Sequence, residues 1–376
     1  MPKRTNKAIK PYVKKDGKTY YKFQTYLGKD DNGKSVLITR QGFTSYNEAN
    51  DEFEHLRSKG ASSYTKKKQI KLSEIWELWF QNYKKQVKES SANKTKQVYK
   101  NHVEPNFGDK YLDQIKPAPL QKWIDKKSEE IVKYMDAYNI LNNLLKYSIV
   151  LGYLKDNPLI RVIRPKNIIR KSEDTKDNYY DNKEELDYFL KVAKSQNIRK
   201  YTFFKLLSST GLRRGEALAL EWSDIDFSKH VIHITKTLAQ GFDNKQIIQT
   251  PKTKNSLRDV PMSNKLMDDL KKYRASRKVI YPLVFCKRDG DYLNLAAPSN
   301  WLHYLYRGHP EIKQITVHGF RHTFATLMLQ PGTGNTPKDV QMILGHENID
   351  MTLNIYTHES KKGKNNIIKS INSIGF

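Results

Sequence analysis

Four short motifs in the second half of the chain combine side chains that could act on a phosphate ester. They lie at residues 210–216 (Thr-Gly-Leu-Arg-Arg-Gly-Glu), 250–254 (Thr-Pro-Lys-Thr-Lys), 318–322 (His-Gly-Phe-Arg-His) and 344–358, where Leu-Gly-His leads to Ile-Tyr-Thr-His. Two arginines can clamp the oxygens of one phosphate, because guanidinium groups match its geometry and stay protonated. A tyrosine can attack the phosphorus and form a covalent ester, while histidine and lysine transfer protons. The set predicts metal-free phosphoryl transfer, since arginine and lysine already neutralise the developing charge.

Each motif taken singly also has an ordinary structural explanation. Arg213 and Glu216 could be an i, i+3 ion pair at the start of a helix. Tyr356 is one of 23 tyrosines, and taken alone it would normally be assigned to the core. His318 and His322 stand at the i, i+4 spacing of a metal pair, but no carboxylate follows the pattern of a zinc-binding helix. The order of the motifs therefore carries more information than any one of them.

Composition points to a polyanionic partner. The chain has 376 residues, enough for two or three domains, and a formal net charge of +27. A hydrophobic content of 38% and 11% aromatic residues are sufficient for folded cores, so the charge belongs to a globular protein. The single cysteine, Cys286, excludes an internal disulfide and multi-cysteine zinc sites, and no apolar run approaches the ~18 residues of a membrane span. We therefore expect a cytoplasmic, nucleic-acid-binding protein without cofactor or metal, and no membrane partner.

Residues 1–65 are expected to form a small β-sheet with one helix. β-forming runs at 19–27 and 34–40 flank an Asn-Gly pair, which favours a hairpin turn. Ser45 and Glu48 then form a capping box, and the helix that they begin should end near Gly60. Lysines and tyrosines on the open face of such a sheet could enter a DNA groove; the alternative is a domain that contacts only protein.

Residues 66–165 are expected to be helical, and 166–183 to be a linker. Leu72, Ile75, Trp76, Trp79 and Phe80 repeat at the spacing of one buried helix face. A second long helical stretch runs over 131–154, and the polar, weakly periodic residues 166–183 separate this domain from the next.

Residues 184–376 should be mainly helical with a small β-insert. Alternation at 231–234 and a second run ending at 260–261 indicate a hairpin or small sheet. The stretch 332–335 is expected to be a turn, with Thr336-Pro337 starting the next helix. Apolar residues at 367, 368, 371 and 374 form one face of a terminal helix, which could pack on its own domain or on a neighbouring copy. The predicted fold class is therefore multidomain α+β.

The motifs resemble those of the tyrosine recombinase (phage integrase) family. The segment 210–220, with Trp222 and Asp224, resembles its first arginine box, and His318-x-x-Arg321 with 322–326 resembles the second. Leu-Gly-His at 344–346, with a tyrosine ten residues later, resembles the end of that box and the nucleophile. The order of domains along the whole chain is similar to that of integrases of Gram-positive temperate phages and integrative mobile elements. The matching motifs cover only about half of the chain.

The resemblance implies a role for each site residue. Arg213 and Arg321 would hold the scissile phosphate, with His318 in proton transfer or hydrogen bonding. His346 would bond to a phosphate oxygen, and Tyr356 would attack to give a 3′-phosphotyrosyl link and a free 5′-hydroxyl.

A lysine of the β-insert would protonate the 5′ oxygen. Lys252 and Lys254 both qualify, and the Pro-Lys-Thr-Lys pattern favours Lys252. Glu216 would orient an arginine of the site, whereas Arg214 would face the surface or the DNA backbone.

The family plan further implies an arm-type DNA-binding domain at 1–65, a core-binding (SAM-like) domain at 66–165 and the catalytic domain at 184–376. Its partners would be double-stranded DNA at core and arm attachment sites and three further copies in a homotetramer, with a host DNA-bending protein and an excisionase as candidates. Two alternatives remain open: a type IB topoisomerase-like enzyme that relaxes DNA, and an inactive DNA-binding regulator.

Overall fold

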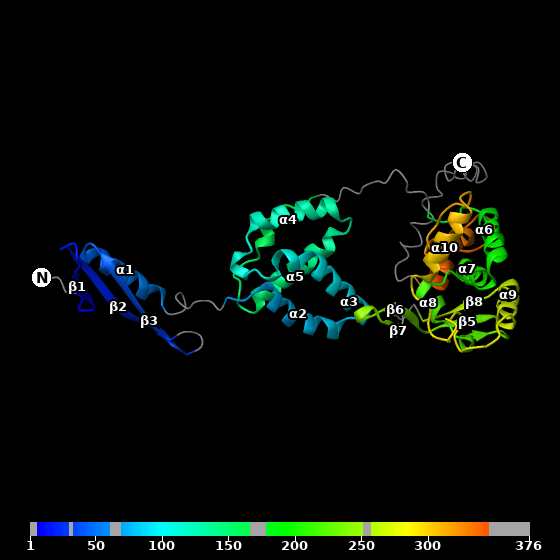
Figure 1. The fold of residues 1–376 in the computed structure, drawn as a ribbon, viewed down its shortest axis with the longest axis horizontal. Coiled ribbons are helices and arrows are strands. Elements are labelled where there is room, and N and C mark those ends of the chain that lie inside the picture. The colour runs from blue at the N-terminus through cyan, green and yellow to red at the C-terminus, as the bar shows by residue number, and fades with distance from the viewer. Residues whose placement is uncertain (1–5, 30–32, 61–68, 166–177, 251–256, 346–376) are drawn as a thin grey trace, which may run out of the picture. The chain divides into compact units, whose positions relative to one another are not determined.

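The computed structural model describes residues 6–29, 33–60, 69–165, 178–250 and 257–345. Its described residues form two compact units. Those up to Asn82 and from Val98 to 165 belong to the first, and those at 83–97 and from Asn178 onward belong to the second. The α+β class predicted from the sequence is confirmed, with a three-stranded sheet and one helix first, then helices, and finally a mainly helical part with small sheets (Figure 1).

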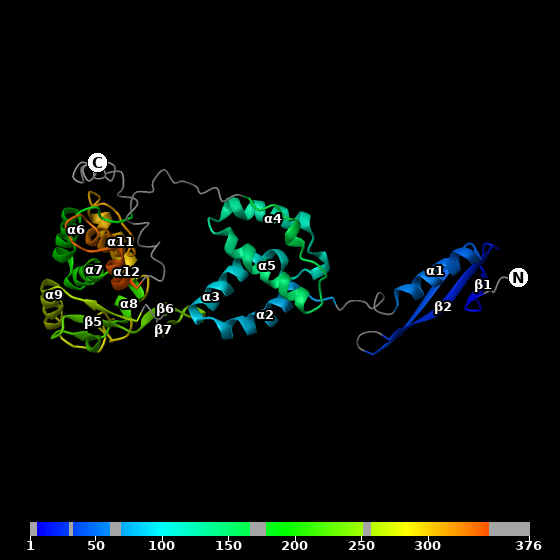
Figure 2. The same ribbon diagram turned by 180° about the vertical axis from the view of Figure 1, so that it is seen from behind.

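The N-terminal domain is a three-stranded antiparallel sheet covered by one helix. Its strands are β1 (Ile9–Val13), β2 (Thr19–Lys29) and β3 (Ser35–Phe43), in the order β1-β2-β3, and α1 spans Tyr46–Lys59. Figure 2 shows α1 lying along one face of the sheet. Phe23, Phe53 and Leu56 fill the core between them. The strand β1 was not among the predicted elements.

The predicted cap of α1 is largely confirmed. Ser45 accepts a hydrogen bond from the Glu48 amide (3.2 Å), and the helix ends before Gly60, which has a φ of 66°. In a capping box the Glu48 carboxylate would accept from the amide of the N-cap residue, Ser45. Here it accepts from the amide of the preceding residue, Thr44 (3.0 Å). Asn32 of the predicted turn lies outside the described residues.

Residues 69–165 are helical, as predicted. The helices are α2 (Leu72–Gln86), α3 (Glu89–Val98), a π-helical segment (Tyr99–Gly108), α4 (Pro117–Glu130) and α5 (Tyr134–Val150), with short 3₁₀ turns at Leu112–Gln114 and Pro158–Arg161. Trp76 stacks on Tyr99 in the core, whereas Trp79 of the predicted buried face is only partly buried. The stretch predicted over 131–154 narrows to α5, because Leu151 and Gly152 turn the chain.

The third part surrounds one large core with helices and two small sheets. Its helices are α6 (Lys183–Gln196), α7 (Ile198–Thr210), α8 (Arg214–Ala219), α9 (Asn264–Ala275), α10 (Ala297–Gly308), α11 (Gly319–Met328) and α12 (Pro337–Leu344), with 3₁₀ turns at Trp222–Asp224 and Phe242–Asn244. One sheet has the order β4-β5-β8 (Ile225–Asp226, Val231–Ile234, Arg258–Pro261), and the other is the hairpin β6-β7 (Thr237–Gln240, Gln246–Gln249). The predicted insert is thus two sheets. α12 starts at the Thr336 cap as predicted.

The part of the predicted linker nearest α6 packs on this third part. The Tyr180 side chain is buried, and its amide donates to Thr323 Oγ1 on α11 (2.9 Å). Asn178 donates to Thr316 Oγ1 (2.9 Å), and Asn182 caps α6. Of the residues predicted as linker, 166–177 lie outside the described residues. The remaining ones anchor the approach to α6.

Candidate active site

A left-handed glycine places the first predicted arginine. Gly211 has a φ of 65° and ends α7, with its amide donating to Leu207 O (2.9 Å). Arg213 then immediately precedes α8. Its amide donates to Glu216 Oε2 and its Nη1 to Glu216 Oε1, both at 2.9 Å. The i, i+3 ion pair considered from the sequence therefore exists, and it holds the Arg213 guanidinium in place.

The second predicted arginine lies beside the first. Arg321, on α11, is only 3% exposed. Its Nη1 donates to Gly211 O and its Nη2 to Leu344 O, both at 2.7 Å. Arg213 Nη2 donates to the next carbonyl, Gly345 O, at 3.1 Å. The two arginines thus meet at the C-terminal end of α12, where the helix leaves carbonyl groups without partners inside the helix.

A third arginine, Arg258 on β8, was missed from the sequence. Its side chain is 6% exposed, and its Nη2 lies 2.9 Å from Glu216 Oε2. Its Nη1 donates to Glu216 Oε1 (3.2 Å) and its Nε to Ile343 O (2.6 Å). The alternation of β8 offered a signal, because Arg258 stands two residues before Val260, which is fully buried. An arginine on the inward side of a strand needs a buried partner.

Glu216 is the carboxylate that these arginines share. Burial favours its neutral form, but hydrogen bonds and the charges of Arg258 and Arg213 outweigh that effect and lower its pKa. It is therefore ionised at neutral pH. The orienting role predicted for Glu216 agrees with these contacts, although the sequence did not reveal that it would serve two arginines.

His318 lies near both predicted arginines. It precedes α11, and its ring meets that of His322 edge to face, with the ring centroids 4.8 Å apart. Partial burial lowers the pKa of His318 to about 4, and the charges of His322, Arg321 and Arg213 act in the same direction. The imidazole is therefore neutral at physiological pH before DNA binds. It can donate one hydrogen bond and accept another.

The remaining predicted residues lie outside the described residues. Lys252 and Lys254 fall between β7, which ends at Gln249, and β8, which begins at Arg258. His346 directly follows Gly345, the last described residue, and Tyr356 and the C-terminal tail lie beyond it. Arg214 is exposed at the first position of α8, where the sequence placed a surface residue.

Residues of α3 hold the hairpin that leads to the lysine segment. The buried Asn93 donates from Nδ2 to Gly241 O (2.6 Å), and Glu89 Oε1 accepts from the Phe242 amide (3.0 Å). Ser90 Oγ donates to Gln249 Oε1 (2.9 Å) at the end of β7. These contacts fix the turn and the last strand residue before the lysines.

Two negative findings apply to the described residues alone. They contain no group of three or more histidine, cysteine or carboxylate residues arranged to hold a metal ion. None of their helices is both long enough and apolar enough to cross a bilayer.

Comparison with known proteins matches two family models in the expected order. The "Phage integrase, N-terminal SAM-like domain" matches residues 71–128, and the "Phage integrase family" matches 181–362. A tyrosine recombinase XerC-like protein of Caldanaerobacter subterraneus subsp. tengcongensis is 28% identical, with 100% of both chains covered. The transposase from transposon Tn916 of Enterococcus faecalis is 29% identical over 67% of this chain and 65% of its own.

Solved structures share the fold. The Tn1549 transposon integrase in complex with a circular intermediate DNA aligns with a TM-score of 0.64 at 21% identity, over 80% of this chain and 99% of that one. A lambda integrase dimer bound to a COC′ core site aligns with a TM-score of 0.57 at 15% identity, over 94% and 96%. Because the two phage integrase models together match more than half of the chain, and the arginines lie inside the second match, the chain belongs to the tyrosine recombinase (phage integrase) family and is a tyrosine-type site-specific recombinase.

Proposed function

We propose that this recombinase integrates or excises a mobile element through a 3′-phosphotyrosyl intermediate formed by Tyr356. One observation carries the proposal: Arg213 and Arg321 converge on the carbonyls of Leu344 and Gly345. Those residues directly precede His346 and stand shortly before Tyr356. Two groups suited to binding a phosphate therefore lie where the segment with the proposed nucleophile begins.

In the proposed cleavage step, the Tyr356 hydroxyl oxygen attacks the phosphorus, its proton passes to the neutral imidazole of His318, and the bond to the 5′ oxygen breaks. Lys252 supplies the proton to that oxygen; Lys254 is the alternative. The new ester retains the free energy of the phosphodiester, so a 5′-hydroxyl of a second DNA strand can reverse the step. No energy-supplying cofactor is needed for this exchange.

Arg213 and Arg321 are proposed to neutralise the non-bridging oxygens, which take up charge in the transition state. Arg213 is suited to direct contact because its side chain is 37% exposed. His318 donates a hydrogen bond or transfers a proton as a neutral imidazole, and His346 donates to a phosphate oxygen. Glu216 keeps Arg213 oriented through the contacts described above.

The N-terminal domain is proposed to bind arm-type DNA through the open face of its sheet. That face carries Tyr12 and Tyr20 opposite each other and Lys10 opposite Lys22. The Lys14 ammonium lies 4.0 Å from the Tyr20 ring centroid. Lysines neutralise phosphates, and aromatic rings offer stacking surfaces, so this face suits a nucleic acid.

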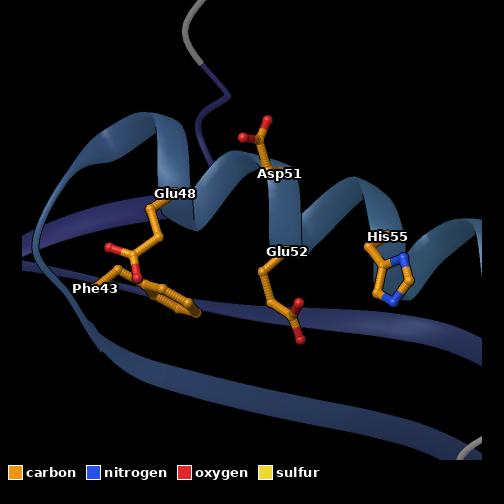
Figure 3. Close-up of a pocket in the computed structure, with 5 residues that line it drawn as sticks. All are labelled: Phe43, Glu48, Asp51, Glu52 and His55. Atoms are coloured by element: carbon orange, nitrogen blue, oxygen red, sulfur yellow. The ribbon is translucent and has the colours of Figure 1, made fainter.

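The helix side of the same domain has the opposite charge. Figure 3 shows a hollow between α1 and β3 that is lined by Phe43, Glu48, Asp51, Glu52 and His55. Three carboxylates there would repel phosphates. This contrast supports the sheet face as the DNA-binding side.

The helical domain is proposed to bind core-type DNA, and four copies to assemble on two sites. A host DNA-bending protein and an excisionase are proposed as further partners, and the cytoplasm, where the chromosome lies, as the location. The charge of +27 supports this picture, because it favours binding to a polyanion over an extended surface.

The test uses attachment-site DNA nicked just beyond the cleavage position, so that the covalent complex accumulates. We expect Tyr356→Phe to abolish the covalent adduct, while Tyr304→Phe, at an exposed tyrosine of α10, leaves it intact. Adduct formation should also proceed in EDTA. An adduct at wild-type level with Tyr356→Phe would refute the nucleophile, and site-independent relaxation by a monomer would favour a topoisomerase.

A further inference from the structure

Three arginines bind three successive carbonyls at the end of α12. Arg258 Nε donates to Ile343 O (2.6 Å), Arg321 Nη2 to Leu344 O (2.7 Å) and Arg213 Nη2 to Gly345 O (3.1 Å). The last carbonyls of a helix have no partners inside it and form the negative end of its dipole. The arginines come from the N-cap of α8, from β8 and from α11, so the three elements are joined at the point where the chain leaves α12.

Arg258 differs from the other two in its surroundings. Its side chain is 6% exposed against 37% for Arg213, and two of its nitrogens bind the two oxygens of Glu216. All three nitrogens of the Arg258 guanidinium are engaged, by the Glu216 carboxylate and by Ile343 O, so its charge is already compensated. Arg321 is equally buried, but its two terminal nitrogens bind neutral backbone carbonyls. The Arg258 contacts determine where Glu216 and the end of α12 lie.

The Arg258 contacts also govern how Arg213 is held. With Arg258 bound to both carboxylate oxygens, the Arg213 guanidinium donates to Glu216 through Nη1, in addition to the bond from the Arg213 amide, and its other N–H groups can serve other acceptors. Without Arg258, Glu216 would be a buried carboxylate with a single strong partner. Removing one partner of a buried ion pair is costly, because the remaining charge has lost its compensation.

We propose that Arg258 is a positioning residue for recombination, which fixes Glu216 and the last turn of α12 so that Arg213 approaches the phosphate in one arrangement. This inference rests on the proposed roles of Arg213 and Tyr356. Arg258 itself touches no reacting atom.

The inference predicts a pH dependence that a merely structural residue would not create. The described charged groups around Glu216 are Arg213 from the start of α8, Arg258 from β8 and Arg321 from α11. Arg258 and Arg213 both lower the pKa of Glu216, which burial alone would raise, and Arg258 has the larger effect. In Arg258→Met the burial effect prevails and the pKa rises, so Glu216 becomes protonated and releases Arg213 as the pH falls.

The experiment compares Arg258→Met and Arg258→Lys with Arg307→Met, which removes an exposed arginine of α10. The rate of adduct formation on nicked attachment-site DNA is measured with saturating protein between pH 6 and 8, together with binding to uncleaved DNA. We expect Arg258→Met to cleave about 10- to 100-fold more slowly at pH 7, since small misplacements of catalytic groups cost this much. Its DNA affinity should match that of Arg307→Met.

One further variant, together with Arg258→Lys, separates positioning from folding. Glu216→Gln in the Arg258→Met background should abolish the added pH dependence, because the titrating group is gone. Arg258→Lys should fold and cleave slowly without that pH dependence, since an ammonium neutralises Glu216 but does not hold the Ile343 carbonyl as well.

The inference would be overturned if Arg258→Lys cleaved at the wild-type rate. It would also be overturned if Arg258→Met and Arg307→Met cleaved at equal rates across the pH range. Failure of the proposed function would look different. In that case Tyr356→Phe would still form the adduct, whatever Arg258 does.

Discussion

The left-handed turn between α7 and α8 should be unusually intolerant of a side chain. A β-carbon added at Gly211 would lie 2.5 Å from Leu344 Cδ2 and 2.7 Å from Phe324 Cδ1. Both neighbours are buried, and Gly211 O is the acceptor of Arg321 Nη1. Gly211→Ala should therefore disturb the turn and the arginine together.

The expected cost has two parts. The left-handed backbone, with a φ of 65°, costs a residue with a β-carbon about 1–2 kcal/mol. Crowding against two buried side chains adds about 1–3 kcal/mol. Gly334 provides a matched control, because its φ is 73° and a β-carbon there meets nothing within 4 Å. Gly334→Ala should therefore show only the backbone part.

Hydrogen exchange of peptides from α7 and α11 measures this difference in the third part of the chain without interference from the other domains. The crowding part, about 1–3 kcal/mol, corresponds to exchange about 5- to 150-fold faster in Gly211→Ala than in Gly334→Ala. Equal exchange rates in the two variants would refute the close approach of α7, α11 and α12 at this glycine.

Two further outcomes are expected. The stability of the third part should fall as the pH drops from about 6.5 toward 4, because the unfolded chain binds a proton more readily than His318, whose pKa is lowered to about 4. His318→Asn should flatten this dependence in urea unfolding, by well under about 1.4 kcal/mol per pH unit, since the partly exposed ring is screened by solvent. Asn93→Ala should speed hydrogen exchange across β6 and β7 about 5- to 100-fold, because Gly241 O loses its buried donor. Unchanged exchange there would mean that α3 does not hold the hairpin.

The sequence predicted the helices and the strands of the insert because their signals are local. Alternation marked β5, a second run ending at 260–261 marked β8, and the Thr336-Pro337 pair marked the start of α12. The boundaries of the long helix over 131–154 were too wide, since its ends depend on turns that periodicity does not register. β1 was missed because five residues with a proline carry little strand signal without their partner β2.

The arginine cluster shows which contacts local sequence patterns cannot predict. Arg213 and Arg321 were found because they stand in recognisable motifs, and the structure brings them together at α12. Arg258 is 42 residues away from Glu216 in the chain, so no short-range spacing links the two. Only the folded arrangement of α8 and β8 creates their buried pair. The same holds for Asn93 and Gly241, which are 148 residues apart.

The charge balance of the arginine cluster favours the binding of a phosphate. Among the described residues, the guanidinium groups of Arg213, Arg258 and Arg321 surround one carboxylate, that of Glu216. Burial lowers the pKa of Arg321, and the charge of Arg213 acts in the same direction, so the arginines repel one another. The carbonyls at the end of α12 offset part of this repulsion through the helix dipole. A phosphodiester would add a negative charge, so its binding would reduce the repulsion among the arginines that is already present in the folded protein.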